Sequence, residues 1–483
     1  GRRGATFPSR ETAQTFLEPT FFTANDAERK DVKSRRFFRQ LIHKDKREQV
    51  RFAKETAMFR FLHAADLHLD SPLRGLDRYE GAPVEVFRRA GRGALENLVQ
   101  LALEQEVQFV LLAGDVFDGD WPDVNTGLFF VSQMAKLRKK GIPVYLVSGN
   151  HDAANRMSGS LPYPDNVYVF PTDRPHTFQT PGLPVAIHGQ SYARQDVREN
   201  LAAAYPTPAA RYFNIGLLHT ALGGREGHQP YAPCDVNQLV ALGYDYWALG
   251  HVHQRESVWD ADRPLIEFPG NTQGRHVRET GPKGCLLVKV DSTFHMQKRF
   301  YPLDVCRWAC VEVDCSGVGT KEELLERTGD GLAEALEAAE DRPLAVRVVL
   351  RGECALHALL LARWETYRDQ LRSQANVLAP ERLWIEKLEV QTTPPTGLPA
   401  AEQLPEDAFS EIDRAIRQLQ EDEEKLRQML ETEEFKRLRN KLPPELRDGD
   451  EAMDFSDANL LRTVLEQAKA LLLEGPDAKE DRR

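Results

Sequence analysis

Apolar runs of strand length alternate with amphipathic stretches over residues 59–150. The apolar runs are "FRFLHAAD" (59–66), "VQFVLLAGD" (107–115) and "IPVYLVSGN" (142–150). Between them, apolar residues recur with a helical period over residues 86–106 and 125–141. This alternation of strand and helix is typical of a parallel sheet with helices on its faces. We therefore predict an α/β fold that begins near residue 58.

Five later apolar segments are separated by helices less regularly, and we expect them to form a second sheet packed on the first. They are "PVAIHGQSY" (184–192), "RYFNIGLLHT" (211–220), "YDYWALGHVH" (244–253), "PLIEFPG" (264–270) and "GCLLVKVD" (284–291). Together with the earlier strands they predict an α/β sandwich of two sheets, flanked by helices, over residues 58–303.

A small α+β accessory domain is predicted over residues 304–395. Its strand candidates are "ACVEVDC" (309–315), "LAVRVVLRG" (344–352) and "RLWIEKLEV" (382–390), with helical sequence after the first two. Residues 396–483 begin with a linker rich in Pro and Thr, followed by a charged helix over residues 405–442 and a final helix. These helices either bind a partner protein or pack on one another as a hairpin, and the sequence leaves both open.

Residues 1–57 are interpreted as an irregular, basic N-terminal extension. They hold 14 Lys and Arg residues against 8 Asp and Glu residues and have no clean hydrophobic period. One basic helix is expected over residues 27–55. Its cationic side chains suit an arm that binds nucleic acid, although a solvated tail explains them as well. They are Arg35, Arg36, Arg39, Lys44, Lys46 and Arg47.

The composition of the 483 residues fits a soluble globular protein with a net charge of -11. This charge argues against a generally basic surface but leaves room for a local basic groove. No apolar run approaches the roughly 18 residues of a membrane helix, so we expect a cytoplasmic protein without membrane contact. Cys306, Cys310 and Cys315 lack CxxC spacing, which favours buried free thiols in a reducing compartment over a zinc site.

Side chains that bind metals stand at the ends of five strands. They form "DLH" (Asp66, His68), "GDVFD" (Asp115, Asp118), "GNHD" (Asn150, His151, Asp152), "GLLHT" (His219) and "LGHVH" (His251, His253). Carboxyl ends of parallel strands meet at one sheet edge, and residues i and i+2 of an extended segment point the same way. Carboxylate, imidazole and amide together suit two divalent cations such as Mn²⁺, Fe²⁺ or Zn²⁺. The isolated histidines are interpreted as satisfied core or surface residues: His63, His176, His228, His295 and His357.

In their order and flanking glycines, these motifs resemble those of the calcineurin-like metallophosphoesterases, across roughly residues 59–303. The ligands that the resemblance implies are Asp66, His68 and His253 for one metal ion, Asn150, His219 and His251 for the second, and Asp115 as the bridge. Two such cations hold a phosphoryl oxygen and activate a water molecule for in-line displacement. The resemblance further implies that His151 protonates the leaving group, that Asp152 orients His151, and that Asp118 supports a metal ligand.

Further segments resemble the SbcD/YhaO-type DNA repair exonucleases. They are "AADLHLDSPLRGL" (64–76), "HGQSYA" (188–193) and, for the YhaO branch in particular, "FPGNTQGRHVRETGPKG" (268–284). The last segment places cationic side chains near the ligands, where they would bind a phosphate backbone. They are Arg275, His276, Arg278 and Lys283. A tight glycine turn with ordinary surface charges is the alternative.

The resemblance implies a nuclease that hydrolyses DNA and uses two divalent cations, with Mn²⁺ as the expected metal. In that group a capping domain and helices that bind an SbcC-like coiled-coil ATPase follow the catalytic domain, and residues 304–395 and 405–474 match this order. The chain has no P-loop signature, so an ATPase would be a partner. A homodimer is also implied, through helices at residues 84–105 and 125–140. Apolar residues of the first serve equally well as core: Val86, Leu95, Leu98 and Leu101.

Two other functions are weighed against this one. A nucleotide phosphodiesterase or protein phosphatase would carry the same metal motifs but no open basic trough. A module that serves only for assembly would not need the full set of ligands, and the full set is present.

Overall fold

The computed structural model describes residues 58–71, 84–118, 124–154, 161–223 and 231–395, with a few positions beyond residue 415. Every described residue belongs to the unit Met58–Arg483. The predictions for residues 1–57, for His228 and for most of residues 396–483 therefore lie outside the described residues. Among the few described positions beyond residue 415, those assigned to helix are 416–417, 435–437, 461–462 and 464–465.

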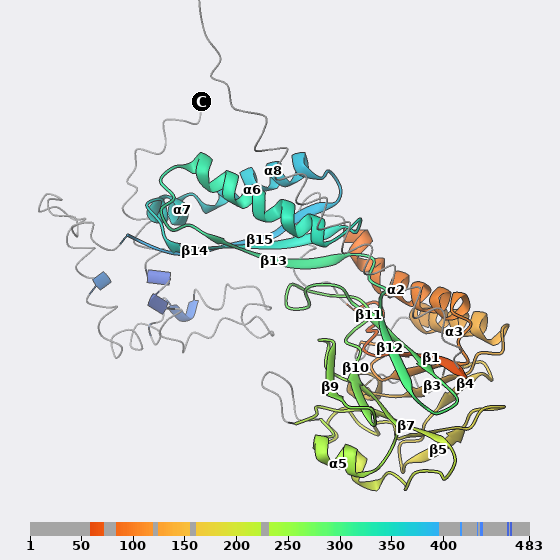
Figure 1. Cartoon of the computed structure of the whole chain (residues 1–483). Coiled ribbons are helices and arrows are strands. Elements are labelled where there is room, and N and C mark those ends of the chain that lie inside the picture. The colour runs from red at the N-terminus through yellow and green to blue at the C-terminus, as the bar shows by residue number, and fades with distance from the viewer. Residues whose placement is uncertain are drawn as a thin grey trace, which may run out of the picture. The chain divides into compact units, whose positions relative to one another are not determined.

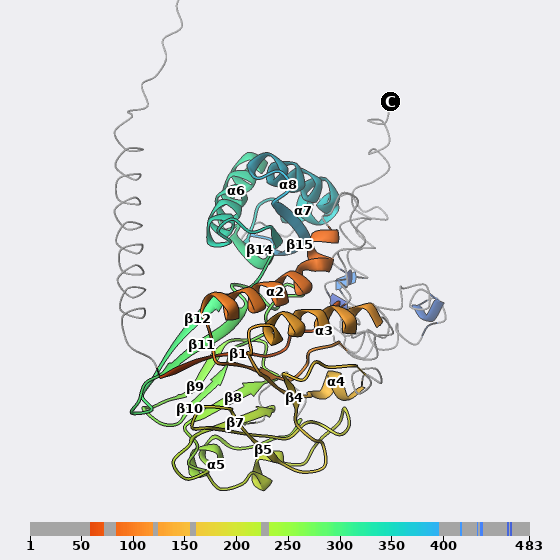
Figure 2. The same ribbon diagram turned by 90° about the vertical axis from the view of Figure 1, so that its right-hand side faces the viewer.

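Six strands form the first sheet, in the order β12-β11-β1-β2-β3-β4. They are β1 (Phe59–Ala64), β2 (Phe109–Ala113), β3 (Val144–Val147), β4 (Val167–Val169), β11 (Gly284–Val290) and β12 (Met296–Pro302). β1 to β4 are parallel, whereas β11 and β12 extend one edge in antiparallel pairing. Helices α2 (Val84–Glu104) and α3 (Val124–Arg138) connect the first three strands and lie side by side against this sheet (Figure 2). β2 is buried along its whole length, because such a strand is covered on both faces.

The second sheet also has six strands, in the order β5-β6-β7-β8-β10-β9. They are β5 (His176–Gln179), β6 (Val185–Gly189), β7 (Phe213–His219), β8 (Tyr246–Gly250), β9 (Glu256–Asp260) and β10 (Leu265–Phe268). The four central strands are parallel, and β5 and β9 are antiparallel edges. The short helices η3 (Leu201–Ala204) and α5 (Val236–Ala241) pack on its outer face around Trp247 and Leu249.

The two sheets pack face to face through aromatic side chains. The Phe61 ring of the first sheet stacks on the Phe109 ring at 4.9 Å between centroids and meets Tyr246 of the second sheet edge-on at 5.2 Å. Ile215 and Leu217 of β7 are fully buried in the same core. Burial of each such side chain contributes about 1.5–3 kcal/mol, so this core fixes where the strand ends of both sheets lie.

A third sheet follows, in which three parallel strands have the order β13-β14-β15. Its elements are β13 (Arg307–Asp314), α6 (Lys321–Ala338), β14 (Leu344–Glu353), α7 (His357–Ala362), α8 (Trp364–Leu378) and β15 (Leu383–Thr393). The helices lie on one face of the sheet (Figure 1), around a core that includes Val346, Val348 and Tyr367. Helix α6 begins after Thr320, whose side chain accepts a hydrogen bond from the Glu323 amide.

The predicted α/β sandwich of two sheets flanked by helices is confirmed, with one correction among the cysteines. All six cysteines are free, but Cys310 is exposed, because alternate residues of β13 face away from the helices. On α2, Leu95, Leu98 and Leu101 are buried as core residues, whereas Val86 is exposed. No helix in the described part of the chain is both long and apolar enough to cross a membrane.

Candidate metal centre

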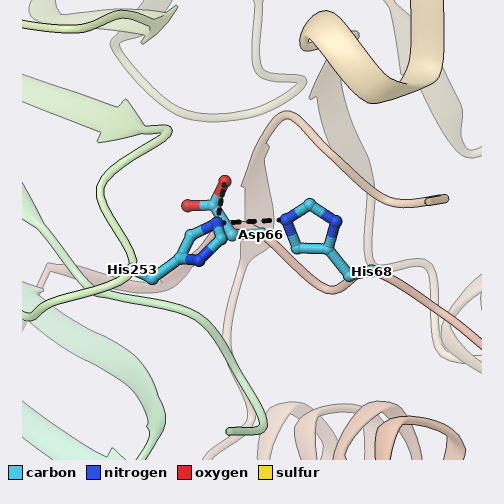
Figure 3. A group of neighbouring side chains, drawn as sticks. All are labelled: Asp66, His68 and His253. Atoms are coloured by element: carbon cyan, nitrogen blue, oxygen red, sulfur yellow. Dashed lines mark hydrogen bonds and ion pairs between the residues drawn. The ribbon is translucent and has the colours of Figure 1, made fainter. Parts of the chain in front are cut away.

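Three side chains that follow β1 and β8 form the first ligand group. The Nε2 atoms of His68 and His253 lie 3.1 Å apart, and His253 Nε2 lies 3.9 Å from Asp66 Oδ1 (Figure 3). One ligand atom from each of the three residues lies within 4.8 Å of the other two, which is the arrangement that a single metal ion requires. Because β1 belongs to the first sheet and β8 to the second, this group joins the two sheets.

The second ligand group gathers the ends of β2, β3, β7 and β8. Ligand atoms of Asp115, His219 and His251 lie within 4.8 Å of one another. His219 Nε2 lies 3.0 Å from Asn150 Oδ1 and 3.4 Å from Asp115 Oδ2. The structure thus brings together the four candidate ligands Asp115, Asn150, His219 and His251.

Asp115 lies between the two ligand groups. Its Oδ2 atom is 3.4 Å from His219 Nε2 and 3.9 Å from His68 Nε2. Burial acts to raise the pKa of Asp115, yet the neighbouring histidines hold that pKa below its usual range. Burial likewise opposes charge on His219, but Asp115 raises the pKa of His219 to about 9. A charged carboxylate at this position suits a bridging ligand.

Hydrogen bonds on the far side of two imidazole rings determine which nitrogen carries the proton. The pairs are His253 Nδ1 with Glu279 Oε1 at 2.6 Å and His219 Nδ1 with the Ala113 carbonyl at 2.9 Å. Because these oxygens accept the N–H, the Nε2 atom of each neutral ring carries a lone pair. His68 Nδ1 lies 3.4 Å from Asp118 Oδ1 without a hydrogen bond, and His68 Nε2 lies 3.1 Å from His253 Nε2. Imidazole nitrogens that converge beside a carboxylate in this way fit divalent cations.

Glycines next to the motifs leave space that the ligands occupy. A Cβ atom on Gly149 would lie 2.3 Å from Asp115 Oδ1, and one on Gly114 would lie 2.4 Å from His219 Nδ1. A Cβ on Gly250 would lie even closer to the carbonyl oxygen of Ala113. Glycine is therefore required in "GD", "GN" and "GH", because neighbouring atoms lie too close for a side chain.

Four of the candidate ligands have a backbone with positive φ. The values are 52° at Asp66, 43° at His68, 51° at Asp115 and 105° at His251. Such conformations are uncommon outside glycine and persist only where the surrounding structure holds them. The left-handed turns after β1, β2 and β8 thus aim these side chains at the centre.

The carboxylate paired with His151 is Asp118, whereas Asp152, which was expected to orient His151, accepts hydrogen bonds from backbone amides. His151 Nδ1 lies 2.8 Å from Asp118 Oδ1. Asp152 accepts hydrogen bonds from the Phe117 and Gly149 amides and so ties the ends of β2 and β3 together. The physical reason is that α4 (Asn150–Ala154) begins inside the motif, and adjacent residues of a helix point in different directions.

Glu279 and Ser71 are two residues of the site that were not predicted from the sequence. Glu279 accepts from His253 Nδ1 and pairs with Arg275 NH2 at 3.1 Å. Burial opposes its charge, yet His253 and Arg275 hold the pKa of Glu279 below its usual range. Ser71 Oγ donates to Asp118 Oδ2 at 2.6 Å. The signal for Glu279 lay inside "RHVRETG", a segment considered only for its cations.

Of the four cationic side chains predicted to bind phosphate, only Arg275 lies at the ligands. Its NH1 atom is 3.8 Å from Asp118 Oδ2, and its side chain is 17% exposed. Lys283 is buried, and its Nζ donates to the His253 carbonyl at 3.1 Å. Burial also lowers the pKa of Lys283. His276 and Arg278 are exposed on the same loop.

Comparison with known families assigns both parts of the chain. Residues 59–255 match the family described as calcineurin-like phosphoesterase. Residues 308–393 match the middle domain of metallophosphoesterase YhaO. The first match includes every candidate ligand, and the second covers the third sheet and its helices.

Individual relatives agree with this assignment. The uncharacterized metallophosphoesterase YhaO of Bacillus subtilis is 35% identical over 366 residues, which are 74% of this chain and 87% of that protein. The DNA double-strand break repair protein Mre11 of Methanopyrus kandleri is 26% identical over 60% of this chain and 64% of its own length. The SbcD subunit of the nuclease SbcCD of Bacillus subtilis is 23% identical over 46% of this chain and 63% of its own length. The chain therefore belongs to the YhaO family of calcineurin-like metallophosphoesterases.

Proposed function

We propose that this metallophosphoesterase hydrolyses phosphodiester bonds in DNA, with two Mn²⁺ ions bound by the seven candidate ligands. The observation that carries the proposal is the convergence of two ligand groups on Asp115, next to a histidine that is paired with a carboxylate. When bound, two divalent cations orient a phosphate, offset its charge and lower the pKa of water.

His151 is the proton donor of this proposal. Burial acts to lower the pKa of His151, but the hydrogen bond to Asp118 raises it above its usual value, which favours the protonated form. The side chain is 34% exposed and therefore accessible from solvent. Since Nδ1 is held by Asp118, Nε2 is the nitrogen that donates to the leaving oxygen.

Arg275 is the residue proposed to bind a phosphate oxygen. Its guanidinium lies beside both Asp118 and Glu279, and these carboxylates fix its direction. Burial acts to lower the pKa of Arg275, but Glu279 raises it, so the charge is retained. A guanidinium in this setting makes charge-assisted hydrogen bonds to phosphate.

DNA is proposed as the substrate because the similar proteins include a DNA double-strand break repair protein, Mre11, and a subunit of the nuclease SbcCD. The test is cleavage of labelled single- and double-stranded DNA with Mn²⁺, in parallel with the small diester bis(4-nitrophenyl) phosphate. Cleavage of all three is expected, and His151→Ala is expected to retain metal and lose activity. Hydrolysis of the small diester alone, with and without an ATPase partner, would refute DNA as the substrate.

A smaller phosphoester, such as a nucleotide, is the second candidate. The observation in its favour concerns the described cations that were predicted to bind phosphate: Arg275 lies beside Asp118, whereas Lys283 Nζ donates to the His253 carbonyl. Turnover of nucleotide diesters without cleavage of DNA would support it.

Two assembly partners are also proposed. The relative named as part of the nuclease SbcCD supports an SbcC-like ATPase as the partner of the C-terminal helices, which lie mostly outside the described residues. Exposed apolar side chains on α2 and α3, namely Val86, Val124 and Leu128, support a homodimer through these helices. Light scattering of the wild type and of Leu128→Glu tests the dimer.

A further inference from the structure

Residues 271–283, in the loop between β10 and β11, hold the hydrogen-bond partner of a candidate metal ligand. This ligand loop carries Glu279, which accepts from His253 Nδ1. The Arg275 amide donates to Glu279 Oε2 at 2.7 Å, and Asn271 Nδ2 donates to the same oxygen at 2.9 Å. The position of Glu279 therefore depends on the backbone of the ligand loop.

The other side of the ligand loop is hydrogen-bonded to residues 305–308, where the third sheet begins. Trp308 Nε1 donates to the Gly274 carbonyl at 3.1 Å. The Gln273 side chain accepts from the Val305 amide and donates to the Cys306 carbonyl, both at 2.8 Å. Trp308 and Gln273 are 3% and 4% exposed. Water does not replace a broken bond in such a buried place, so these bonds hold the loop firmly.

Side chains from α2 and β15 pack around this contact. Phe87 of α2 meets the Trp308 ring edge-on at 5.5 Å, and Trp384 of β15 packs against the same cluster. A Cβ atom on Gly274 would lie 3.1 Å from Trp308 Cδ1 and 2.8 Å from the Glu279 carbonyl. The backbone of the ligand loop is thus in close contact with Trp308, and a shift of the indole moves it.

We propose that Trp308 is a positioning residue of the metal centre, through which the third sheet sets the metal affinity of His253. Trp308 Nε1 donates to the Gly274 carbonyl, the adjacent Arg275 amide donates to Glu279, and Glu279 accepts from His253 Nδ1. The inference rests on the proposed function to the extent that His253 binds metal. A contact that merely joined two domains would explain the apolar packing, but it would not require hydrogen bonds to this loop.

Two tryptophans of the same cluster provide a matched pair of variants. Trp308→Phe removes the N–H that donates to Gly274 and keeps an aromatic ring. Trp384→Phe makes the same chemical change, yet among the described residues the Trp384 indole N–H has no acceptor. Both are made in the full chain, and Mn²⁺ binding to the metal-free proteins is measured by calorimetry, with urea unfolding alongside. Gln273→Leu, which removes the bonds to residues 305 and 306, is a second variant in case the first does not fold.

Trp308→Phe and Gln273→Leu are expected to weaken one Mn²⁺ site about fivefold, less than the 10–100-fold typical of losing a direct partner of a ligand. Trp384→Phe is expected to stay within twofold of the wild type. Unchanged affinity in Trp308→Phe overturns the proposal, whether or not urea stability falls, and so do equal losses in both tryptophan variants. If the wild-type chain binds Mn²⁺ but does not cleave DNA, only the nuclease proposal is refuted. The role of Trp308 is still tested by comparing the Mn²⁺ affinities of the variants with that of the wild type.

Discussion

Replacing Gly149 by alanine should damage the metal centre through a single added methyl group. The new Cβ would lie 2.3 Å from Asp115 Oδ1 and 2.8 Å from His219 Cε1. Real Cβ atoms essentially never approach another atom within 3.0 Å, so Asp115 has to move by about 0.7 Å, the difference between 3.0 and 2.3 Å. Asp115 is 1% exposed, and its Oδ1 accepts from the His151 amide at 2.9 Å, so it cannot move without losing that bond.

The expected loss of Mn²⁺ affinity follows from how little a ligand atom can move before it no longer binds the metal ion. Ligand distances in metal sites vary by only about 0.2 Å, so a shift of this size moves Asp115 out of the position proposed for the bridging ligand. Losing a partner that merely supports a ligand costs 10–100-fold in affinity, so we expect Gly149→Ala to weaken Mn²⁺ binding by at least about 100-fold, or about 2.8 kcal/mol.

Gly319→Ala is the matched control, because nothing lies within 4 Å of the added Cβ and the φ of Gly319 is not positive. Metal content after dialysis against Mn²⁺ and hydrolysis of bis(4-nitrophenyl) phosphate are measured for both variants. If Gly149→Ala binds two ions and has normal turnover, the backbone at residue 149 moves instead of Asp115, and the prediction is refuted.

Three further predictions concern residues that support the site or the core. Glu279→Gln should weaken Mn²⁺ binding about 10–100-fold in calorimetry, because His253 loses a charged partner; unchanged affinity would contradict this role. His151→Asn should keep both ions but lower turnover at least about 100-fold, and loss of metal would show that His151 is a ligand. Burial lowers the pKa of His63 from 6.5 to about 3, so His63 binds a proton at a higher pH in the unfolded chain than in the folded chain. Against His63→Gln, the metal-free wild type should therefore lose about 1.4 kcal/mol of unfolding free energy per pH unit below 6.5 in urea titrations, and parallel pH curves would refute this.

The candidate ligands could be predicted from sequence because each lies at the end of a buried strand or within about four residues after it. In "DLH" and "GHVH" the two ligands are separated by one residue, and the core between the sheets determines where these strands end. Phe61 and Tyr246 in that core are recognisable as apolar positions of their strands. Local patterns of this kind predicted both the sandwich and the residues that converge on its edge.

Contacts between distant parts of the chain could not be predicted in this way. Asp118 and Asp152 both stand in the motifs, and only the helical turn at Asn150 decides that Asp118 is the one that meets His151. Glu279 lies 26 residues from His253, in a loop without regular structure. The burial of Lys283 depends on its packing beneath the His253 backbone, which no pattern around residue 283 reveals.

The positive φ angles at Asp66, His68, Asp115 and His251 also restrict which residues can replace them. Aspartate, asparagine and histidine tolerate this backbone conformation better than other side chains except glycine, and β-branched residues tolerate it worst. Backbone geometry and metal chemistry thus favour the same few residue types at these positions. A descendant that had lost catalysis would still meet the backbone requirement, so its sequence should drift towards asparagine or glycine here rather than towards valine or isoleucine.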